Sequence, residues 1–229
     1  AGDALVFDLR ALPRRSRVPL PGSACRPAAR LRRHTAACRS LAWSARRRGL
    51  VLSGAADGAL CLWDAERAAL SGELALESPL SVRAQAHASG GVLGAAFEPE
   101  VASLYASVGL DGRLCTWDAR CASDEPSASI EAHAGGSWSL AFAPGVQGVL
   151  ATGGRDGVVR LWDVRQPKLA LRAFAGHGKG STVLCVEWVR EGSALLLACP
   201  PALPATRLTS SRAPCWLRLT APVRCTSGR

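Results

Sequence analysis

The stretch TGGRDGVVRLWD at residues 152–163 decides the fold of this chain, because the chain holds two further versions of it. These are SGAADGALCLWD at 53–64 and SVGLDGRLCTWD at 107–118. In each version a Ser or Thr stands four residues before Asp-Gly, and Trp-Asp begins six residues after that Asp. Such a strict internal spacing predicts a repeated structural unit.

Each unit has the local chemistry of a small antiparallel sheet. Asp-Gly between two short apolar runs is typical of a β-hairpin, since Gly accepts a positive φ and Asp tolerates the turn. A further predicted strand precedes each hairpin and ends in an aromatic residue, which is Trp43, Phe97 or Phe142. One such sheet cannot bury both of its faces alone, so we expect neighbouring sheets to stack radially in a β-propeller.

A His also stands 29 or 30 residues before each Trp, and with it the set resembles the WD-repeat family. In that family, His, Ser or Thr, Asp and Trp form a buried hydrogen-bonded tetrad within each blade. By position, the resemblance implies three structural tetrads: His34, Ser53, Asp57 and Trp63; His87, Ser107, Asp111 and Trp117; His133, Thr152, Asp156 and Trp162. A buried imidazole, hydroxyl and indole each need a partner, and a chain ending on a carboxylate supplies them.

The repeat predicts how the chain is organised. Residues 1–33 should hold the end of a preceding blade and an Arg- and Pro-rich spacer that is poorly ordered over 11–33. Blades are expected at 34–86, 87–132 and 133–176, with a partial blade at 177–198 and a disordered tail at 199–229. The fold class is therefore all-β: an incomplete WD-repeat β-propeller with about three and a half blades of a seven-bladed ring. Such an arc does not close, and we expect unpaired sheet edges at its ends.

The charge and the cysteines exclude several classes of protein. The net charge of +10 would suit nucleic acid, but the Arg residues gather in the two flanks, which indicates compositional bias. The nine Cys include no Cys-x-x-Cys pair, so a reducing compartment is expected. No signal peptide and no apolar run long enough to span a bilayer is present, so we expect no membrane association.

The sequence contains no complete motif for catalysis or metal binding. AGHGKGST at 175–182 hints at a phosphate-binding loop, but Ala173 and Gly180 stand where that loop needs Gly and Ser or Thr. The four His are more than forty residues apart, which is not metal-ligand spacing. No Gly-x-Ser-x-Gly elbow occurs either. We therefore predict no enzyme activity, no catalytic residue, no metal and no cofactor or small-molecule substrate.

The spacers between the repeats are more specific than the repeats. YASVGLDGRLCTWDAR and LATGGRDGVVRLWDVRQPKLALRAFAGH resemble the retinoblastoma-binding, chromatin-assembly-factor small-subunit group of histone-binding WD-repeat proteins. The resemblance covers roughly residues 5–198. It implies a scaffold in the nucleus, with the cytoplasm as an alternative. Its partners would be histones or other subunits of chromatin assembly and modification complexes, without direct nucleic-acid contact.

The family binds a histone tail through acidic and aromatic side chains in the loops after each His and before each Asp-Gly. In this chain Ala37 and Arg39 stand where the family has an acid and a Tyr, and Leu110 and Arg155 stand where it has an acid before Asp-Gly. Trp138 would be an exposed aromatic anchor in one of these loops. Arg39, Leu110, Trp138 and Arg155 are the four candidate partner-binding residues of these loops, and Arg120 and Arg165 are two further candidates. We expect weaker binding of a basic tail than in the family.

Two alternatives stay open. Trp-Asp-x-Arg occurs twice, ending at Arg120 and Arg165, and resembles the docking signature of substrate adaptors of cullin ubiquitin ligases. The peroxisomal targeting-signal receptor is also a WD-repeat protein with similar spacers. Purified histones, the propeller linker of the ligase and peroxisomal cargo would distinguish the three functions.

Overall fold

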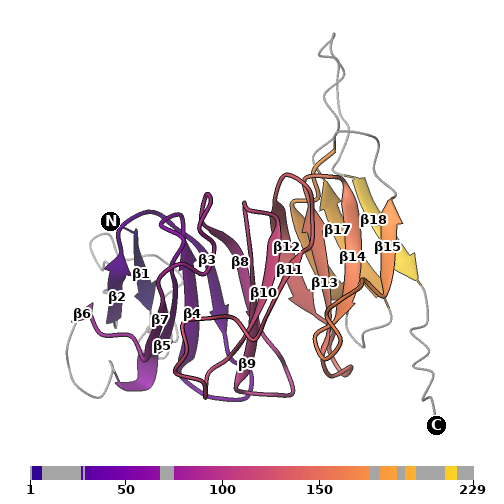
Figure 1. Ribbon diagram of the computed structural model, residues 1–229. Coiled ribbons are helices and arrows are strands. Elements are labelled where there is room, and N and C mark those ends of the chain that lie inside the picture. Colours follow the sequence, from indigo (N-terminus) through magenta and orange to yellow (C-terminus); the bar gives the residue numbers. More distant parts are fainter. Residues whose placement is uncertain are drawn as a thin grey trace, which may run out of the picture.

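The computed structural model describes residues 2–6, 27, 29–67, 75–175, 181–189, 194–199 and 215–220. Almost all regular structure in these ranges is strand, apart from a short helical stretch at 65–67. The strands form five sheets in a row, with the N-terminus at one end of the row and the last strand at the other (Figure 1). No helix in the described ranges is long and apolar enough to cross a membrane.

Three of the sheets are four-stranded and antiparallel, and we name them blades one to three. Blade one holds β3 (Cys38–Trp43), β4 (Leu50–Ala55), β5 (Leu60–Asp64) and β7 (Ser81–Arg83). Blade two holds β8 (Val92–Phe97), β9 (Leu104–Gly109), β10 (Arg113–Asp118) and β11 (Ala128–Glu131). Blade three holds β12 (Ser137–Phe142), β13 (Val149–Gly154), β14 (Val158–Asp163) and β15 (Arg172–Ala175).

A three-stranded sheet flanks the blades at each end of the row. The N-terminal sheet holds β1 (Gly2–Val6), β2 (Ala29–His34) and β6 (Ala75–Leu76), and β6 runs parallel to β2. The C-terminal sheet holds β16 (Cys185–Val189), β17 (Ala194–Cys199) and β18 (Cys215–Thr220). Because these two sheets lie at opposite ends of the row, the five sheets form an open arc and not a closed ring (Figure 1).

The Asp-Gly turns between the two central strands of each blade follow from their side chains. Gly58 and Gly112 have φ values of 82° and 79°, a conformation that side chains with a Cβ rarely adopt. A Cβ on Gly112 would also lie 2.1 Å from the carbonyl oxygen of His133, at the start of the next blade. The turns therefore require Gly for the backbone and for the contact with the following blade.

The innermost strand of each blade contains a β-bulge near its first residue. The pairing register shifts between Cys38 and Ser40 in β3, and equivalent shifts occur in β8 and β12. A bulge inserts one residue that has no partner on the neighbouring strand. In the three blades these residues are Arg39, Leu93 and Trp138.

The hydrophobic cores lie between sheets and not within one sheet. The core between blades one and two draws on both of them: Leu52, Leu62, Tyr105 and Trp117. A second core joins blades two and three in the same way. The blades therefore bury much of their faces against their neighbours, as predicted from the repeat, although Leu41 and Trp43 of blade one are 56% and 54% exposed.

Hydrogen bonds also join the innermost strands of adjacent blades. The Ala95 amide donates to Ser40 Oγ at 2.8 Å, which links blade two to blade one. The Val186 amide donates to Ser139 Oγ at 3.1 Å in the equivalent link between β16 and β12. Between blades two and three, Gly94 occupies the corresponding position of β8 and offers no hydroxyl.

Buried charged side chains also join neighbouring blades. Glu98, which is 2% exposed, follows β8 and accepts the Glu100 amide at 2.7 Å within its own loop. Its other oxygen accepts the Gly148 amide of blade three at 3.3 Å. Arg83, at the end of blade one, lies over the Trp117 ring of blade two and donates to the Cys121 carbonyl at 2.7 Å.

Two predictions about the flanks are wrong in part. Residues 29–33 are predicted to lie in a poorly ordered spacer, yet they belong to β2, which pairs with β1. The tail at 199–229 is predicted to be disordered, yet Cys215–Thr220 forms β18 along β17. The physical reason is that the backbone N–H and C=O groups of CWLRLT pair with the otherwise unpaired edge of β17. Residues 11–26, His177 and the rest of the tail lie outside the described residues.

Candidate functional site

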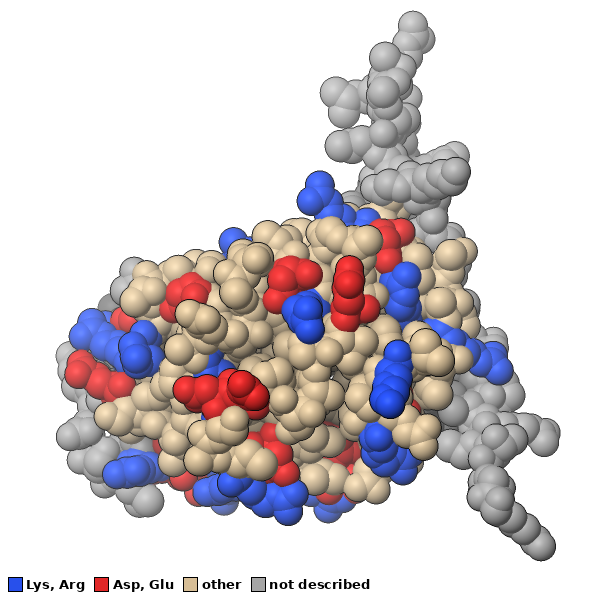
Figure 2. Space-filling model, in the orientation of Figure 1, with Lys and Arg blue, Asp and Glu red and all other residues tan. Residues whose placement is uncertain are grey.

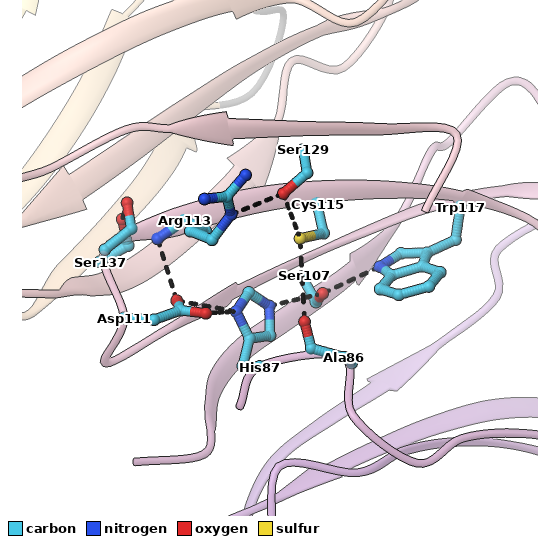
Figure 3. Close-up of polar contacts among 10 residues, drawn as sticks. Ala86, His87, Ser107, Asp111, Arg113, Cys115, Trp117, Ser129 and Ser137 are labelled. Carbon is cyan, nitrogen blue, oxygen red and sulfur yellow. Dashed lines mark hydrogen bonds and ion pairs between the residues drawn. The ribbon is translucent and has the colours of Figure 1, made fainter. Parts of the chain in front are cut away.

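The second tetrad shows how a blade holds its loops in place. Trp117 Nε1 donates to Ser107 Oγ at 2.9 Å, and the same Oγ lies 2.9 Å from His87 Nε2 (Figure 3). His87 Nδ1 lies 2.9 Å from Asp111 Oδ1. The tautomer that satisfies every partner has its proton on Nδ1, so that Ser107 donates to Nε2 and the imidazole donates to the carboxylate.

The other two tetrads have the same order of contacts. Their indoles, Trp63 and Trp162, each donate to the central hydroxyl at 2.8 Å. That hydroxyl lies 2.7 Å from the imidazole in the first tetrad and 2.8 Å from it in the third. The structure therefore brings together each set of four residues that the spacing predicted: His34, Ser53, Asp57 and Trp63 in one, and His133, Thr152, Asp156 and Trp162 in the other.

Burial and hydrogen bonding set the charges within the tetrads. Burial lowers the pKa of His87 and His133, although a neighbouring Asp acts in the opposite sense on each. Burial on its own would raise the pKa of Asp156, but hydrogen bonds from Arg160 and His133 bring it below its usual value. Burial thus favours the neutral form of His87 and His133, and the hydrogen bonds to Asp156 favour its ionised form.

Hydroxyl, imidazole and carboxylate in a row are also the parts of a hydrolase triad, so their accessibility matters. Ser107 and His87 are both 0% exposed, and Ser107 Oγ already accepts the indole N–H. A nucleophile has to reach the substrate carbonyl, which these groups do not do from inside the blade. The arrangement positions loops and does not attack a substrate.

The tetrads fix the loops after each His and the turns before each Asp-Gly. The Leu110 amide donates to the Gly91 carbonyl at 3.2 Å, and the Arg155 amide donates to the Gly136 carbonyl at 3.0 Å. Blade one has the same bond, from the Ala56 amide. We call the surface formed by these loops, bulges and turns the tetrad face: residues 35–39, 56–58, 88–93, 110–112, 134–138 and 155–157.

Three of the four candidate partner-binding residues lie exposed on the tetrad face. Arg39 is the bulge residue of β3, and Arg155 stands in the turn after β13. Leu110 is 37% exposed and borders the glycine loops of two blades. A Cβ on Gly136 would lie 3.3 Å from Leu110 Cδ1, so this leucine spans the junction between blades two and three.

The prediction for Trp138 is wrong, because this residue is not an exposed anchor in a loop. It is the bulge residue of β12, and its side chain is half-buried. Its Nε1 atom is buried and has no hydrogen-bond partner in the part of the chain that the structure describes. The bulge turns the side chain toward Gly136, where an added Cβ would lie 3.5 Å from Nε1.

Arg120 and Arg165 lie at the other end of the blades, after β10 and β14. Each guanidinium binds the Asp two residues earlier through Nε and Nη2: Arg120 contacts Asp118 at 3.0 and 2.6 Å, and Arg165 contacts Asp163 at 3.0 and 2.9 Å. Hydrogen bonds from these guanidiniums lower the pKa of both carboxyls. The two pairs therefore have one geometry, well away from the tetrad face.

Sequence reasoning did not find the buried Glu98 and Arg83, because both residue types usually lie in solvent. The only local signal is that Glu98 directly follows the aromatic end of a predicted strand. Burial raises the pKa of the Cys38, Cys61 and Cys115 thiols, to about 12 for Cys61. No group of three or more metal-ligating side chains occurs among the described residues.

The open arc of four-stranded antiparallel sheets, with one tetrad in each blade, defines this fold as an incomplete β-propeller. Residues 25–64 and 124–163 match the family model described as WD domain, G-beta repeat (WD40). Both matches end at the Trp-Asp of a tetrad. Repeats of this type generally serve as non-catalytic scaffolds for protein interaction, and the tetrad face is the candidate surface for that role.

Proposed function

We propose that this chain is part of a non-catalytic, histone-binding type of WD-repeat scaffold, a subunit of chromatin assembly or modification complexes in the nucleus. The observation that carries the proposal is the tetrad face. Three successive blades present equivalent loop, bulge and turn positions in one row, each held from beneath by a buried hydrogen-bonded tetrad. A rigid row of this kind suits recognition of a partner chain, since little order has to be gained on binding.

The chemistry of the described groups favours binding over catalysis. The hydroxyl and imidazole of each tetrad are buried and already paired, as in Ser53 and His34. The buried thiol of Cys61 has its pKa raised to about 12 and stays protonated at neutral pH. The tetrad face can therefore contact a partner through its backbone, Leu110, Arg39 and Arg155.

The spacer resemblance supports the chromatin assignment, because it extends over the linkers between blades and not only over the tetrads. Within that class the partners are histones or other complex subunits. Leu110 and Arg155 stand where the family has an acid that would bind a basic tail, and Arg39 stands where it has a Tyr. We therefore expect this face to bind a basic histone tail weakly, with a small dependence on salt.

The proposal is tested by titrating the chain with purified proteins of each candidate class. Probes are histone H3–H4 tetramers, a chromatin-assembly complex lacking its small WD-repeat subunit, the propeller linker of a cullin ligase, and a peroxisomal targeting peptide. Binding to the assembly complex is the expected result, with tail affinity changing less than about tenfold between roughly 50 and 200 mM salt. Binding only to the ligase linker or the targeting peptide would overturn the proposal, and so would no binding at all.

A further inference from the structure

We propose that the tetrad face binds an extended segment in which two acidic residues flank an apolar centre. This inference rests on the proposed function, because it takes the tetrad face to be the partner-binding surface. It goes further by naming the chemistry of the partner segment. Three features support it, which are the free charge of the face, its apolar centre and the order of both along the blades.

The carboxylates of the tetrad face are already used within the protein. Asp57 accepts the Thr35 amide at 2.8 Å and the Ala59 amide at 3.0 Å, besides its contact with His34. Asp111 lies 2.9 and 3.1 Å from His87 and accepts the Arg113 amide. Both carboxylates are mostly buried and already hydrogen-bonded, so few of their oxygen lone pairs are left for a donor of a partner.

The third carboxylate is neutralised in addition. Arg160 Nη1 lies 2.6 Å from Asp156 Oδ2, and Arg160 is partly shielded from solvent. The charged residues of the tetrad face that are left are Arg39 and Arg155. Both are exposed, and neither forms an ion pair within the described ranges. The exposed charged side chains of the face are thus both basic, whereas its three carboxylates are mostly buried, and this favours an acidic partner at Arg39 and Arg155.

An apolar floor lies between the two arginines. Leu110 is 37% exposed, and Gly90 and Gly136 border it on either side. A Cβ on Gly90 would lie 2.4 Å from Leu110 Cδ2, so the loop and the leucine are in direct contact. Leu93, the half-buried bulge residue of β8, lies in the same blade. Apolar groups of a partner can cover this floor, and burial of apolar area stabilises the contact.

The positions of these residues along the row of blades determine the spacing of the acidic residues in the ligand. Arg39 belongs to blade one, Leu110 to blade two and Arg155 to blade three, and these blades are consecutive (Figure 1). Packed sheets are spaced by roughly 10 Å, so the arginines are separated by on the order of 20 Å. An extended chain covers that distance in about six residues. Two acids about six residues apart, with Leu or Val between them, match the face.

Charges of both signs are mixed on the rest of the visible surface. Figure 2 shows acidic and basic side chains interspersed over the visible side of the molecule, without a field of one sign. A ligand is then selected by the two arginines and the floor, and not by general attraction to a basic surface.

The test uses three fluorescein-labelled peptides that are titrated into the full chain and followed by anisotropy. All have the same apolar centre, and the two flanking positions, six residues apart, are Glu, Gln or Lys. The Glu peptide is expected to bind at least about tenfold more tightly than the Gln peptide, with the Lys peptide weakest. If the Lys peptide binds as tightly as the Glu peptide, the inference is wrong while the proposed function stands. If no peptide binds, the inference and the role of this face both fail.

A charge reversal locates the site. Arg155→Glu should weaken the Glu peptide about tenfold or more and strengthen the Lys peptide, because attraction and repulsion exchange places. The matched control is Arg47→Glu, at an exposed position of the loop between β3 and β4, at the far end of blade one. It makes the same change in net charge and should leave both affinities unchanged. Equal effects of the two variants would overturn the assignment of the site.

Discussion

The first and second tetrads share one template but differ in how closely the imidazole meets the carboxylate. His34 Nδ1 lies 3.4 Å from Asp57 Oδ1, whereas the same contact between His87 and Asp111 measures 2.9 Å. The difference lies in what precedes each His. The His87 amide donates to the carbonyl of Gly58, in the Asp-Gly turn of the blade before it.

The third tetrad has the same support, since the His133 amide donates to the Gly112 carbonyl at 3.0 Å. His34 is instead the last residue of β2, and no Asp-Gly turn of an earlier blade occurs among the described residues. The comparison teaches that a tetrad is tightened by the preceding blade as well as by its own four residues. The hydrogen bonding of each tetrad thus depends on the blade before it.

The largest effect should come from breaking the second tetrad. Asp111→Ala leaves the imidazole of His87 and the Arg113 amide without their acceptor, at a cost of about 1 to 3 kcal/mol in the free energy of unfolding. Asp57→Ala breaks a longer contact with His34 but also leaves the Thr35 and Ala59 amides without their acceptor, so a loss of the same order is expected. Urea unfolding followed by circular dichroism measures both.

Glu125→Ala, at an exposed position, is the control and should leave the unfolding midpoint where it is. An unfolding midpoint for Asp111→Ala equal to that of the control would contradict the structural role of the tetrad.

Acid should weaken the second and third tetrads in a defined pH range. Burial lowers the pKa of His87 and His133 in the folded chain, whereas an unfolded His titrates near about 6.5. The unfolded state therefore binds more protons between those values, and stability falls as the pH drops below about 6.5. Unfolding midpoints in urea from pH 8 to pH 5 measure this loss.

The two imidazoles can be separated through Arg160, which contacts the third tetrad only. Its charge contributes to the lowering of the His133 pKa, so Arg160→Met should raise that pKa and leave the His87 pKa unchanged. Imidazole proton shifts in an NMR titration report each His. A stability that rises toward pH 5 would show that the buried rings are not held neutral.

The smallest effect concerns the missing hydroxyl between blades two and three. Gly94→Ser should supply the bond that Ser40 and Ser139 form at the other junctions, with a gain of about 0.5 kcal/mol. The added Cβ would lie 3.0 Å from Val108 Cγ2, so the valine has to shift slightly. Ser139→Gly is the reverse change and should lower the thermal midpoint. A lower midpoint for Gly94→Ser as well would mean that Val108 cannot yield.

The tetrads could be predicted from the sequence because their chemistry has a fixed spacing. Each hydroxyl, Asp and Trp lies on the same hairpin, and the turn sets their separation. The position of Trp138 could not be predicted, since a bulge inserts an extra residue and interrupts the alternation that identifies a strand. An exposed loop and a bulged strand therefore have the same sequence pattern.

The flanking sheets and the buried Glu98 were harder to predict because they depend on contacts between distant segments. Pairing of β18 with β17 and of β6 with β2 joins segments that no repeat relates. The burial of Glu98 depends in part on the Gly148 amide of a different blade, which the sequence around Glu98 does not indicate. Contacts between distant segments leave no periodic signal.

Glu98 has a consequence for the kinetics of recognition. Its carboxylate joins the loop of blade two to Gly148 of blade three, on the side of the arc opposite the tetrad face. The Glu98 bond and the hydrophobic core between blades two and three hold these blades together at two places. Their relative tilt is therefore set before any ligand binds. A segment that spans Leu110 and Arg155 then meets a preorganised surface, so differences in affinity between related ligands should arise in how slowly they dissociate.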